Sequence, residues 1–249
     1  DQYMLAKLNE LMKAYDEALN GDFARDAIGR KSALLYKEKG LPAAEAWLDG
    51  LLEKATIPEQ KVATLMAKGQ LFHDAAEYQK AIDTFNKAEE FGSKKRDILY
   101  ARSLSYDRMG NVEQAEKDLR EVVRLDPKDA DALNALGYML VVSTTRYQDA
   151  YDLIKQALEL RPDSPAVMDS IGWVTFKKGD AKGAEEWLRK AYAKMPDPEI
   201  GAHLVEVLAV NGKLEEARKL YKEMIAKYPN DKQLADVKQR VADLADKTN

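Results

Sequence analysis

The chain has 249 residues, of which 45% are apolar, so it can bury a sizeable core in one or two domains. Its 39 Lys and Arg residues nearly balance its 43 Asp and Glu residues, and the formal net charge is −4. Affinity for nucleic acid comes chiefly from clustered Lys and Arg, so this mixed-charge composition excludes nucleic acid as an expected partner.

Targeting segments are absent from the sequence itself. No apolar run approaches the ~20 residues that span a bilayer, and no charged segment followed by an apolar one marks a signal peptide. The chain begins Asp1-Gln2-Tyr3 rather than with Met. We therefore expect a fragment or a processed product whose targeting segment lies upstream.

Residues suited to catalysis or metal binding are scarce. Cysteine is absent, and the two histidines are His73 and His203, which excludes thiolate chemistry and leaves little for a metal centre. The sequence has no glycine-rich phosphate loop, no His-Glu-x-x-His and no Gly-x-Ser-x-Gly. We expect no catalytic residues, no metal site and no cofactor, and hence not an enzyme.

A fixed period runs through the chain. Pro127, Pro162, Pro196 and Pro229 are separated by 35, 34 and 33 residues. A set of alanines keeps the same period: Ala81, Ala115, Ala150, Ala184 and Ala217. Two unrelated residue types with one period predict an array of structural repeats.

The segment over residues 1–61 precedes the clearest repeats. Residues 2–20 predict a lone amphipathic helix, the second half of a truncated hairpin. Residues 24–57 predict a divergent helical hairpin that turns at Gly40-Leu41-Pro42. The stretch Thr56-Ile57-Pro58-Glu59 has the form of a capping box, which we expect to open the next helix.

Residues 62–231 predict five helical hairpins. In the fourth, Ser164 can cap the helix that Pro165 opens, and Gly179-Asp180 ends that helix and caps the second. The five hairpins are 62–95, 96–129, 130–164, 165–197 and 198–231. Each leaves an apolar face uncovered, so neighbours must stack. Residues 232–249 predict a polar capping helix and tail, and we find neither a strand nor a linker that would divide the array.

Small residues mark where the two helices of a hairpin approach closely. In the fourth hairpin these are Gly172 and Ala184. The third hairpin carries the fuller pattern of Leu136-Gly137, Ala150, Ala157 and Pro162, which resembles the tetratricopeptide repeat. The resemblance implies an all-α fold, a right-handed α–α superhelix in which helical hairpins stack into a solenoid.

In that family the first helix of each hairpin lines a concave groove that binds protein partners. Carrying the family's groove positions onto this chain gives the candidate partner-binding residues Met66, Gln70, Tyr100, Leu104, Asn134, Tyr138, Val141, Asp169, Trp173 and Phe176. The same stripe continues through His73, Asp107, Ala202, Glu206 and Ala209. We expect this stripe to face solvent, and its aromatic rings suit a protein interface. The alternative is that each ring packs against the adjacent repeat.

Two positions depart from the family pattern. Where Leu is usual at the seventh position, this chain has Lys68 and Arg102. Because a buried unpaired charge is costly, each side chain must reach solvent or meet a carboxylate. We expect both to reach solvent.

From residue 130 onward a narrower resemblance is carried by four stretches: Leu133 to Tyr138, Arg146 to Ala150, Pro165 to Trp173, and Pro196 to Ile200 with His203-Leu204. They resemble a family of proteobacterial outer-membrane tetratricopeptide lipoproteins, one of which binds a periplasmic carboxyl-terminal processing protease. The resemblance implies a non-catalytic adaptor that activates this serine protease and delivers substrates to it. It also implies a periplasmic location, with membrane attachment only through a lipid anchor missing from this sequence, although the sequence does not exclude the cytoplasm.

Two other functions stay open. One is a scaffold for a different envelope assembly process, such as pilus or outer-membrane protein biogenesis. The other is an enzyme or small-molecule site in the groove. That site would need polar groups converging on one cavity, and the sequence shows no such cluster.

Overall fold

A computed structural model describes residues 10, 13–14 and 24–246 of the chain. Over these residues it contains thirteen α-helices, α2 to α14, and no strand. The predicted all-α fold class is therefore confirmed. The helix predicted over residues 2–20 and the end of the tail lie outside the described residues, apart from 10 and 13–14.

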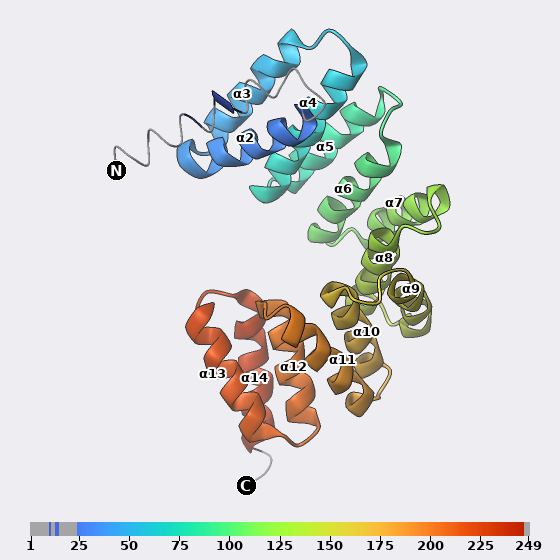
Figure 1. The fold of residues 1–249 in the computed structure, drawn as a ribbon, viewed down its shortest axis with the longest axis vertical. Helices are drawn as coiled ribbons and strands as arrows, with labels where there is room; N and C mark the ends of the chain where they lie inside the picture. Colours follow the sequence, from blue (N-terminus) through green and yellow to red (C-terminus); the bar gives the residue numbers. More distant parts are fainter. Residues whose placement is uncertain (1–9, 11–12, 15–23, 247–249) are drawn as a thin grey trace. The chain divides into compact units, whose positions relative to one another are not determined.

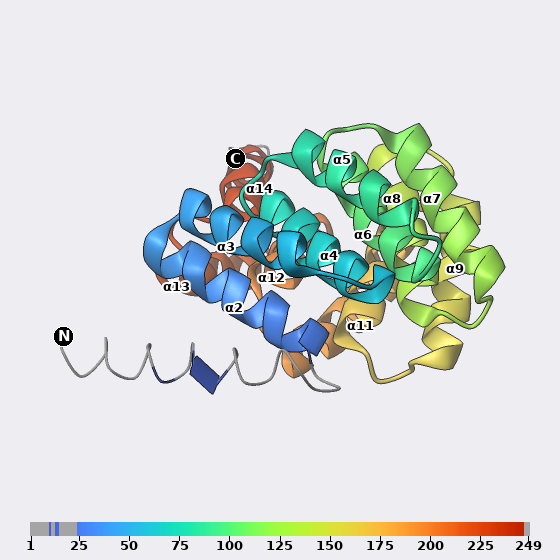
Figure 2. The same cartoon turned by 90° about the horizontal axis from the view of Figure 1, so that it is seen from above.

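The helices fall into two compact units, which meet in the sequence between Leu125 and Asp126. Unit 1 contains three helical pairs: α2 (Ala24–Lys39) and α3 (Leu41–Lys54), α4 (Pro58–Asp74) and α5 (Tyr78–Glu89), α6 (Lys95–Arg108) and α7 (Val112–Leu125). Each pair is a hairpin, and its second helix packs against the first helix of the next pair (Figures 1 and 2). The 34-residue period itself gives no sign of the boundary after α7.

Unit 2 repeats the same design. Its hairpins are α8 (Ala130–Ser143) and α9 (Tyr147–Leu160), α10 (Pro165–Lys177) and α11 (Ala181–Lys194), α12 (Pro198–Val210) and α13 (Leu214–Lys227), followed by α14 (Lys232–Asp246). The first helices α8, α10, α12 and α14 pack against one another in that order (Figure 1). Helix α14 buries Leu234, Val237 and Val241 in the core that it shares with α11, α12 and α13.

Side-chain caps set where several helices of unit 2 begin. Asp129, Ser164, Asp180 and Asp197 each accept a hydrogen bond from the backbone N–H three residues later. The caps predicted at Ser164 and Asp180 are thus confirmed, and each satisfies a backbone N–H that lacks a partner within the helix.

The capping box predicted over residues 56–59 is wrong. Helix α4 starts at Pro58, so its N-cap is Ile57, whose side chain has no acceptor. Gln60 instead accepts a hydrogen bond from the Thr56 backbone N–H at 3.1 Å. Pro at the first helical position moves the helix start one residue past the threonine that the capping box requires.

Close helix contacts within the hairpins explain the small residues. A Cβ added at Gly172 would lie 2.9 Å from Leu188 Cγ and 3.2 Å from Trp187 Cβ, both on the partner helix α11. Ala184, also on α11, is fully buried. The close approach predicted for the fourth hairpin is therefore confirmed.

Lys68 and Arg102 meet carboxylates, which corrects the expectation that they reach solvent. Lys68 Nζ lies 2.5 Å from Asp49 Oδ1, and its side chain is only 15% exposed. Arg102 makes two parallel hydrogen bonds to the Asp118 carboxylate, at 2.7 and 2.9 Å, and binds Glu89 as well. Burial opposes the charge on Arg102, but these hydrogen bonds raise its pKa overall. These carboxylates lie on neighbouring helices, and the sequence period does not predict which side chains of neighbouring helices meet.

Candidate protein-binding groove

A groove of about 350 Å³ runs along the first helices of unit 2. Helices α8, α10, α12 and α14 and the start of α9 contribute its lining. We call this site the groove, and its lining residues are Tyr138, Val141, Val142, Thr144, Tyr147, Trp173, Lys177, Ala202, His203, Glu206, Gln233, Asp236, Val237 and Arg240. The lining combines aromatic and aliphatic side chains with an equal share of polar and charged ones, so it can contact both apolar and polar groups of a partner.

An aromatic stack joins α10 and α12 in the wall of the groove. The rings of Trp173 and His203 lie 4.0 Å apart between centroids, with 16° between their planes. Behind the stack, His203 Nδ1 lies 2.9 and 3.1 Å from the two carboxylate oxygens of Asp169. Both His203 and Asp169 are more than nine-tenths buried. The imidazole is thus held in one orientation by stacking on one side and hydrogen bonding on the other.

The charge state of the buried pair depends on both partners. Burial raises the pKa of the Asp169 carboxyl, and the neighbouring His203 opposes that rise. The ionised carboxylate accepts a hydrogen bond from Nδ1–H of the imidazole, which leaves Nε2 as the second polar atom of the ring.

Polar contacts link three of the first helices, α8, α12 and α14. The Tyr138 hydroxyl on α8 donates to Glu199 Oε1 on α12, and Gln233 Nε2 on α14 donates to the same oxygen at 3.1 Å. Arg240 on α14 binds Glu206 on α12. These contacts tie α8 and α14 to α12, and they pair Glu206 and Arg240 of the lining with each other.

Two charged side chains of the lining, Lys177 and Asp236, form no ion pair among the described residues. Lys177 Nζ lies 4.5 Å from the Trp173 ring centroid, a cation–π contact. It makes no ion pair within the part of the chain that the structure describes. Asp236 on α14 is exposed. Among the described residues, the groove therefore offers one available cation and one available carboxylate, on different helices.

Of the six predicted site residues in unit 2, three line the groove and three do not. Tyr138, Val141 and Trp173 line the groove. Asp169 lies beneath His203, and Phe176 packs on Trp173 with 5.3 Å between centroids. Asn134 is half-buried away from the groove lining, and its Oδ1 has no hydrogen-bond partner among residues 24–246.

The expectation of a solvent-facing stripe needs correction. Val141, Asp169 and Trp173 are 2%, 5% and 6% exposed. For Trp173 the alternative interpretation, packing against the adjacent repeat, is the one observed. Its ring stacks on His203 of that repeat, and the residue also lines the groove. Adjacent first helices pack closely enough to bury much of the stripe that the family pattern assigns to solvent.

The remaining predicted residues belong to unit 1 and do not line the groove. Met66 is half-buried against a core cluster, and Gln70 is exposed and donates to Asp74 at 2.7 Å. Tyr100 is half-buried beneath the Arg96 guanidinium, and Leu104 is 37% exposed. Their role in partner binding stays a prediction.

Sequence reasoning missed the end of α10 and part of what α12 and α14 add to the groove. His203 and Lys177 were not assigned, and α14 was treated only as a cap although Gln233, Asp236 and Arg240 line the groove. A signal was present. Contacting pairs lie 34 residues apart, one repeat, in Asp169–His203, Glu199–Gln233 and Glu206–Arg240. Extending the period into 232–246 would have placed α14 in the groove.

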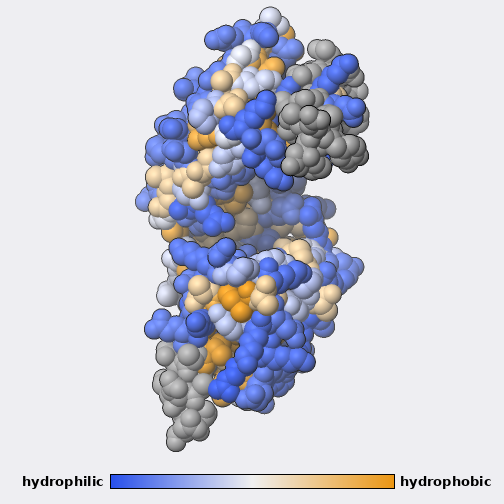
Figure 3. Space-filling model, turned by 90° about the vertical axis from the view of Figure 1, so that its left-hand side faces the viewer, coloured by the Kyte–Doolittle hydropathy of each residue, from blue (hydrophilic) through white to orange (hydrophobic). Residues whose placement is uncertain are grey.

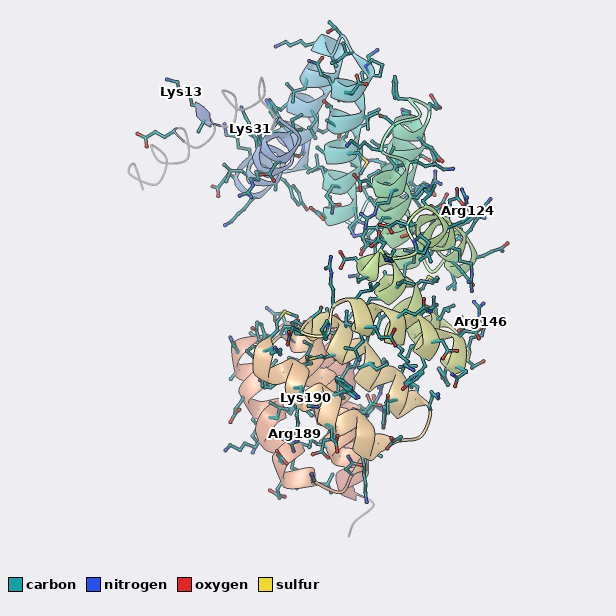
Figure 4. All side chains as sticks on the ribbon, turned by 45° about the vertical axis from the view of Figure 1, so that its right-hand side comes forward. Lys13, Lys31, Arg124, Arg146, Arg189 and Lys190 are labelled. Carbon is teal, nitrogen blue, oxygen red and sulfur yellow. The ribbon has the colours of Figure 1, made fainter. Side chains whose placement is uncertain are left out.

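The face of the molecule seen in Figure 3 is mostly hydrophilic, and its hydrophobic residues gather in patches. Basic side chains project from other helices, such as Lys190 on α11 and Arg124 on α7 (Figure 4). No helix of the described residues is long and apolar enough to cross a membrane. Nor do three His, Cys, Asp or Glu side chains of this part of the chain cluster as metal ligands.

Known proteins share this architecture and parts of this sequence. TPR repeat-containing protein PA4667 of Pseudomonas aeruginosa is 35% identical over 177 residues, which are 71% of this chain and 30% of that protein. Small glutamine-rich tetratricopeptide repeat-containing protein 2 of Mycosarcoma maydis is 27% identical over 111 residues, 45% of this chain and 31% of that protein. The chain therefore spans about a third of the length of these curated relatives.

Solved structures share the fold at low sequence identity. A chain in the structure of the APC/C hetero-tetramer Cut9–Hcn1 is similar over 94% of this chain and 46% of that chain, with a TM-score of 0.75 and 17% identity. The thermophilic protein TTC0263 of Thermus thermophilus matches 74% of this chain and 98% of that chain, with a TM-score of 0.64 and 22% identity.

Models of the tetratricopeptide repeat match residues 100–165, 142–198 and 175–241, which together make up more than half of the chain. The helical hairpins, the one-repeat contacts and these matches agree. The chain belongs to the tetratricopeptide repeat family, whose repeats serve as scaffolds for protein–protein interaction.

Proposed function

We propose that this scaffold is a non-catalytic adaptor that binds and activates a periplasmic carboxyl-terminal processing protease and delivers substrates to it. In this proposal the serine protease supplies the catalytic residues. The adaptor works in the periplasm and is held at the outer membrane by a lipid anchor that lies outside this sequence.

One observation carries the proposal: the four stretches that resemble the protease-binding lipoproteins meet in the groove. The first stretch supplies Tyr138, the second Tyr147, the third Trp173 and the fourth His203, and all four line the groove. Residues far apart in sequence that carry one family's pattern and share one surface are expected of a common binding site rather than of general fold maintenance. The identity with the Pseudomonas aeruginosa relative supports the bacterial setting.

The energetics of the groove suit a protein partner. Trp173 and Tyr138 are residue types that dominate interface energies, because a large ring buries much apolar area at little entropic cost. Val142, at the edge of the groove, is 59% exposed. A partner that covered this apolar edge would gain free energy by removing it from water.

The proposal can be tested by affinity capture from a periplasmic extract, with bound proteins identified by mass spectrometry. Three baits are compared: the chain itself, Val142→Glu in the groove, and the control Val210→Glu. Val210 is 50% exposed and does not line the groove, so the two substitutions are matched. The expected result is a processing protease retained by the chain and by Val210→Glu, and reduced with Val142→Glu.

The captured protease must also cleave a test substrate faster when the chain is added. Capture of pilus or outer-membrane assembly proteins without a protease would contradict the proposal and favour the alternative scaffold. Equal capture by Val142→Glu would contradict the assignment of the groove.

A further inference from the structure

We propose that the groove binds an extended peptide segment in which a single acidic side chain lies next to an apolar one, with Lys177 as the group that binds the acidic side chain. This inference rests on the proposed function, because it assumes that the groove is a protein-binding surface. It adds the chemistry of the bound segment.

Lys177 is the one lining cation that no carboxylate of the described residues neutralises. The other cation, Arg240, is paired with Glu206. Lys177 Nζ instead lies over Trp173, 4.5 Å from the ring centroid, and 5.8 Å from that of Phe176. Aromatic rings position the ammonium group without cancelling its charge, so a carboxylate from a partner can still form an ion pair with it.

His203 offers a second polar contact beside the same tryptophan. Its Nδ1 is hydrogen-bonded to Asp169. Its Nε2 has no hydrogen-bond partner among the described residues and is not fully buried. His203 is 8% exposed and is part of the groove lining. Nε2 is therefore the ring atom left to form a hydrogen bond with a backbone group of the peptide segment.

The apolar half of the groove lies on α8 and the start of α9. Tyr138, Val141, Val142 and Tyr147 form its lining there. An aliphatic or aromatic side chain of the segment would pack on them, and its removal from water would favour binding. The segment therefore needs an apolar residue close to its acidic one.

Asp236 limits how acidic the segment can be. This carboxylate lies on α14 in the same lining and is exposed. A run of acidic residues along the groove would place like charges near Asp236, which is unfavourable. One acidic residue beside Lys177 would form an ion pair with it. A neutral or basic residue near α14 would avoid repulsion by the Asp236 carboxylate.

The test is selection of peptides from a random library displayed inside a phage coat protein, where the peptide has no free carboxyl end. The immobilised proteins are the chain, Lys177→Gln and the control Lys190→Gln. Lys190 makes the same kind of contact, with Nζ 4.8 Å from the Trp187 centroid, but lies on α11 outside the groove (Figure 4). Thermal unfolding checks that all three proteins are folded.

The expected peptides carry one Asp or Glu beside an apolar residue when selected on the chain and on Lys190→Gln. That acidic residue should disappear from peptides selected on Lys177→Gln. Peptides without an acidic residue, or an acidic residue that persists on Lys177→Gln, would overturn the inference. Neither outcome touches the proposed function, which depends on capture of the protease.

A double-mutant cycle then assigns the contact. A selected peptide, synthesised with both ends blocked, should bind Lys177→Gln about tenfold more weakly than the chain, and its acid-to-amide analogue should lose the same factor. Lys177→Gln should have no further effect on the analogue. Independent, multiplying losses would show that the acidic residue binds elsewhere and would overturn the inference.

Discussion

The imidazole of His203 stacks on the indole of Trp173, with 4.0 Å between centroids and 16° between the ring planes. This contact joins the first helices of two consecutive repeats in the wall of the groove. Asp169, one repeat before His203, holds the far side of the imidazole. Residues of consecutive repeats therefore contact one another to form the wall of the groove. The shape of the groove depends on how the repeats stack.

Trp173→Ala should lower the free energy of unfolding by ~3–5 kcal/mol, because it removes a large side chain that is 6% exposed and leaves a cavity beside His203. Urea unfolding measures the loss. Affinity per folded molecule should also fall by more than ~1 kcal/mol if the indole contacts the partner. A stability change below ~1 kcal/mol would show that the ring is not a packing residue.

Arg102→Met should destabilise unit 1 by ~3–5 kcal/mol, since it leaves the 6%-exposed Asp118 carboxylate without its bidentate partner. The control is Arg120→Met, which breaks a surface pair with Glu116 while the Arg120 side chain is 51% exposed. That pair should contribute only ~0–1 kcal/mol. Equal losses for the two variants in denaturant unfolding would contradict the structural role of the Arg102 network.

Gly69→Ala should be destabilising although alanine is the better helix former. A Cβ at Gly69 would overlap the ring of Phe85, which is fully buried on α5 and cannot move aside. The cost expected for such overpacking is ~1–3 kcal/mol. Gly50→Ala in α3 is the control, since nothing lies within 4 Å of its added Cβ, and it should stabilise by ~0.5–1 kcal/mol. A gain in melting temperature for Gly69→Ala would exclude the close contact of α4 with α5.

Glu185 should make unit 2 sensitive to acid. Burial raises its pKa, but hydrogen bonds from Lys213, Arg189 and Asn211 outweigh it and lower the pKa from 4.5 to about 2. A carboxyl with a depressed pKa stabilises the fold above its unfolded pKa, and this stabilisation is lost as the pH falls through the folded pKa. The stabilising effect of Glu185 should therefore disappear between about pH 4.5 and pH 2.

The matching measurement is thermal unfolding of Glu185→Gln and the native chain from pH 7 to pH 2. The difference in melting temperature should be constant near neutrality and shrink below about pH 4.5. The neighbour Glu186 provides the control, because Glu186→Gln removes a carboxylate on the same turn without this network. A difference that does not change with pH would show that Glu185 acts only through packing.

The sequence predicted features that depend on residues close together in the chain, and it did not predict which side chains of different helices meet. The 34-residue period and the turn residues predicted the hairpins, and Ser164 and Asp180 cap their helices because a cap needs only the next three residues. The partners of Lys68 and Arg102 could not be predicted, since Asp49 and Asp118 lie on other helices at separations of 19 and 16 residues. The burial of Trp173 depends likewise on His203, which the stacking of α12 on α10 brings to it.

Site-specific photo-crosslinking from the edge of the groove tests most directly whether the groove binds a processing protease. A photoreactive amino acid replaces Val142 in one sample and the similarly exposed Val210 in another, and each protein is irradiated with a periplasmic extract. We expect a crosslink from position 142 to a carboxyl-terminal processing protease and none from position 210. A protease crosslinked only from position 210, or position 142 crosslinked only to other envelope proteins, would contradict this expectation.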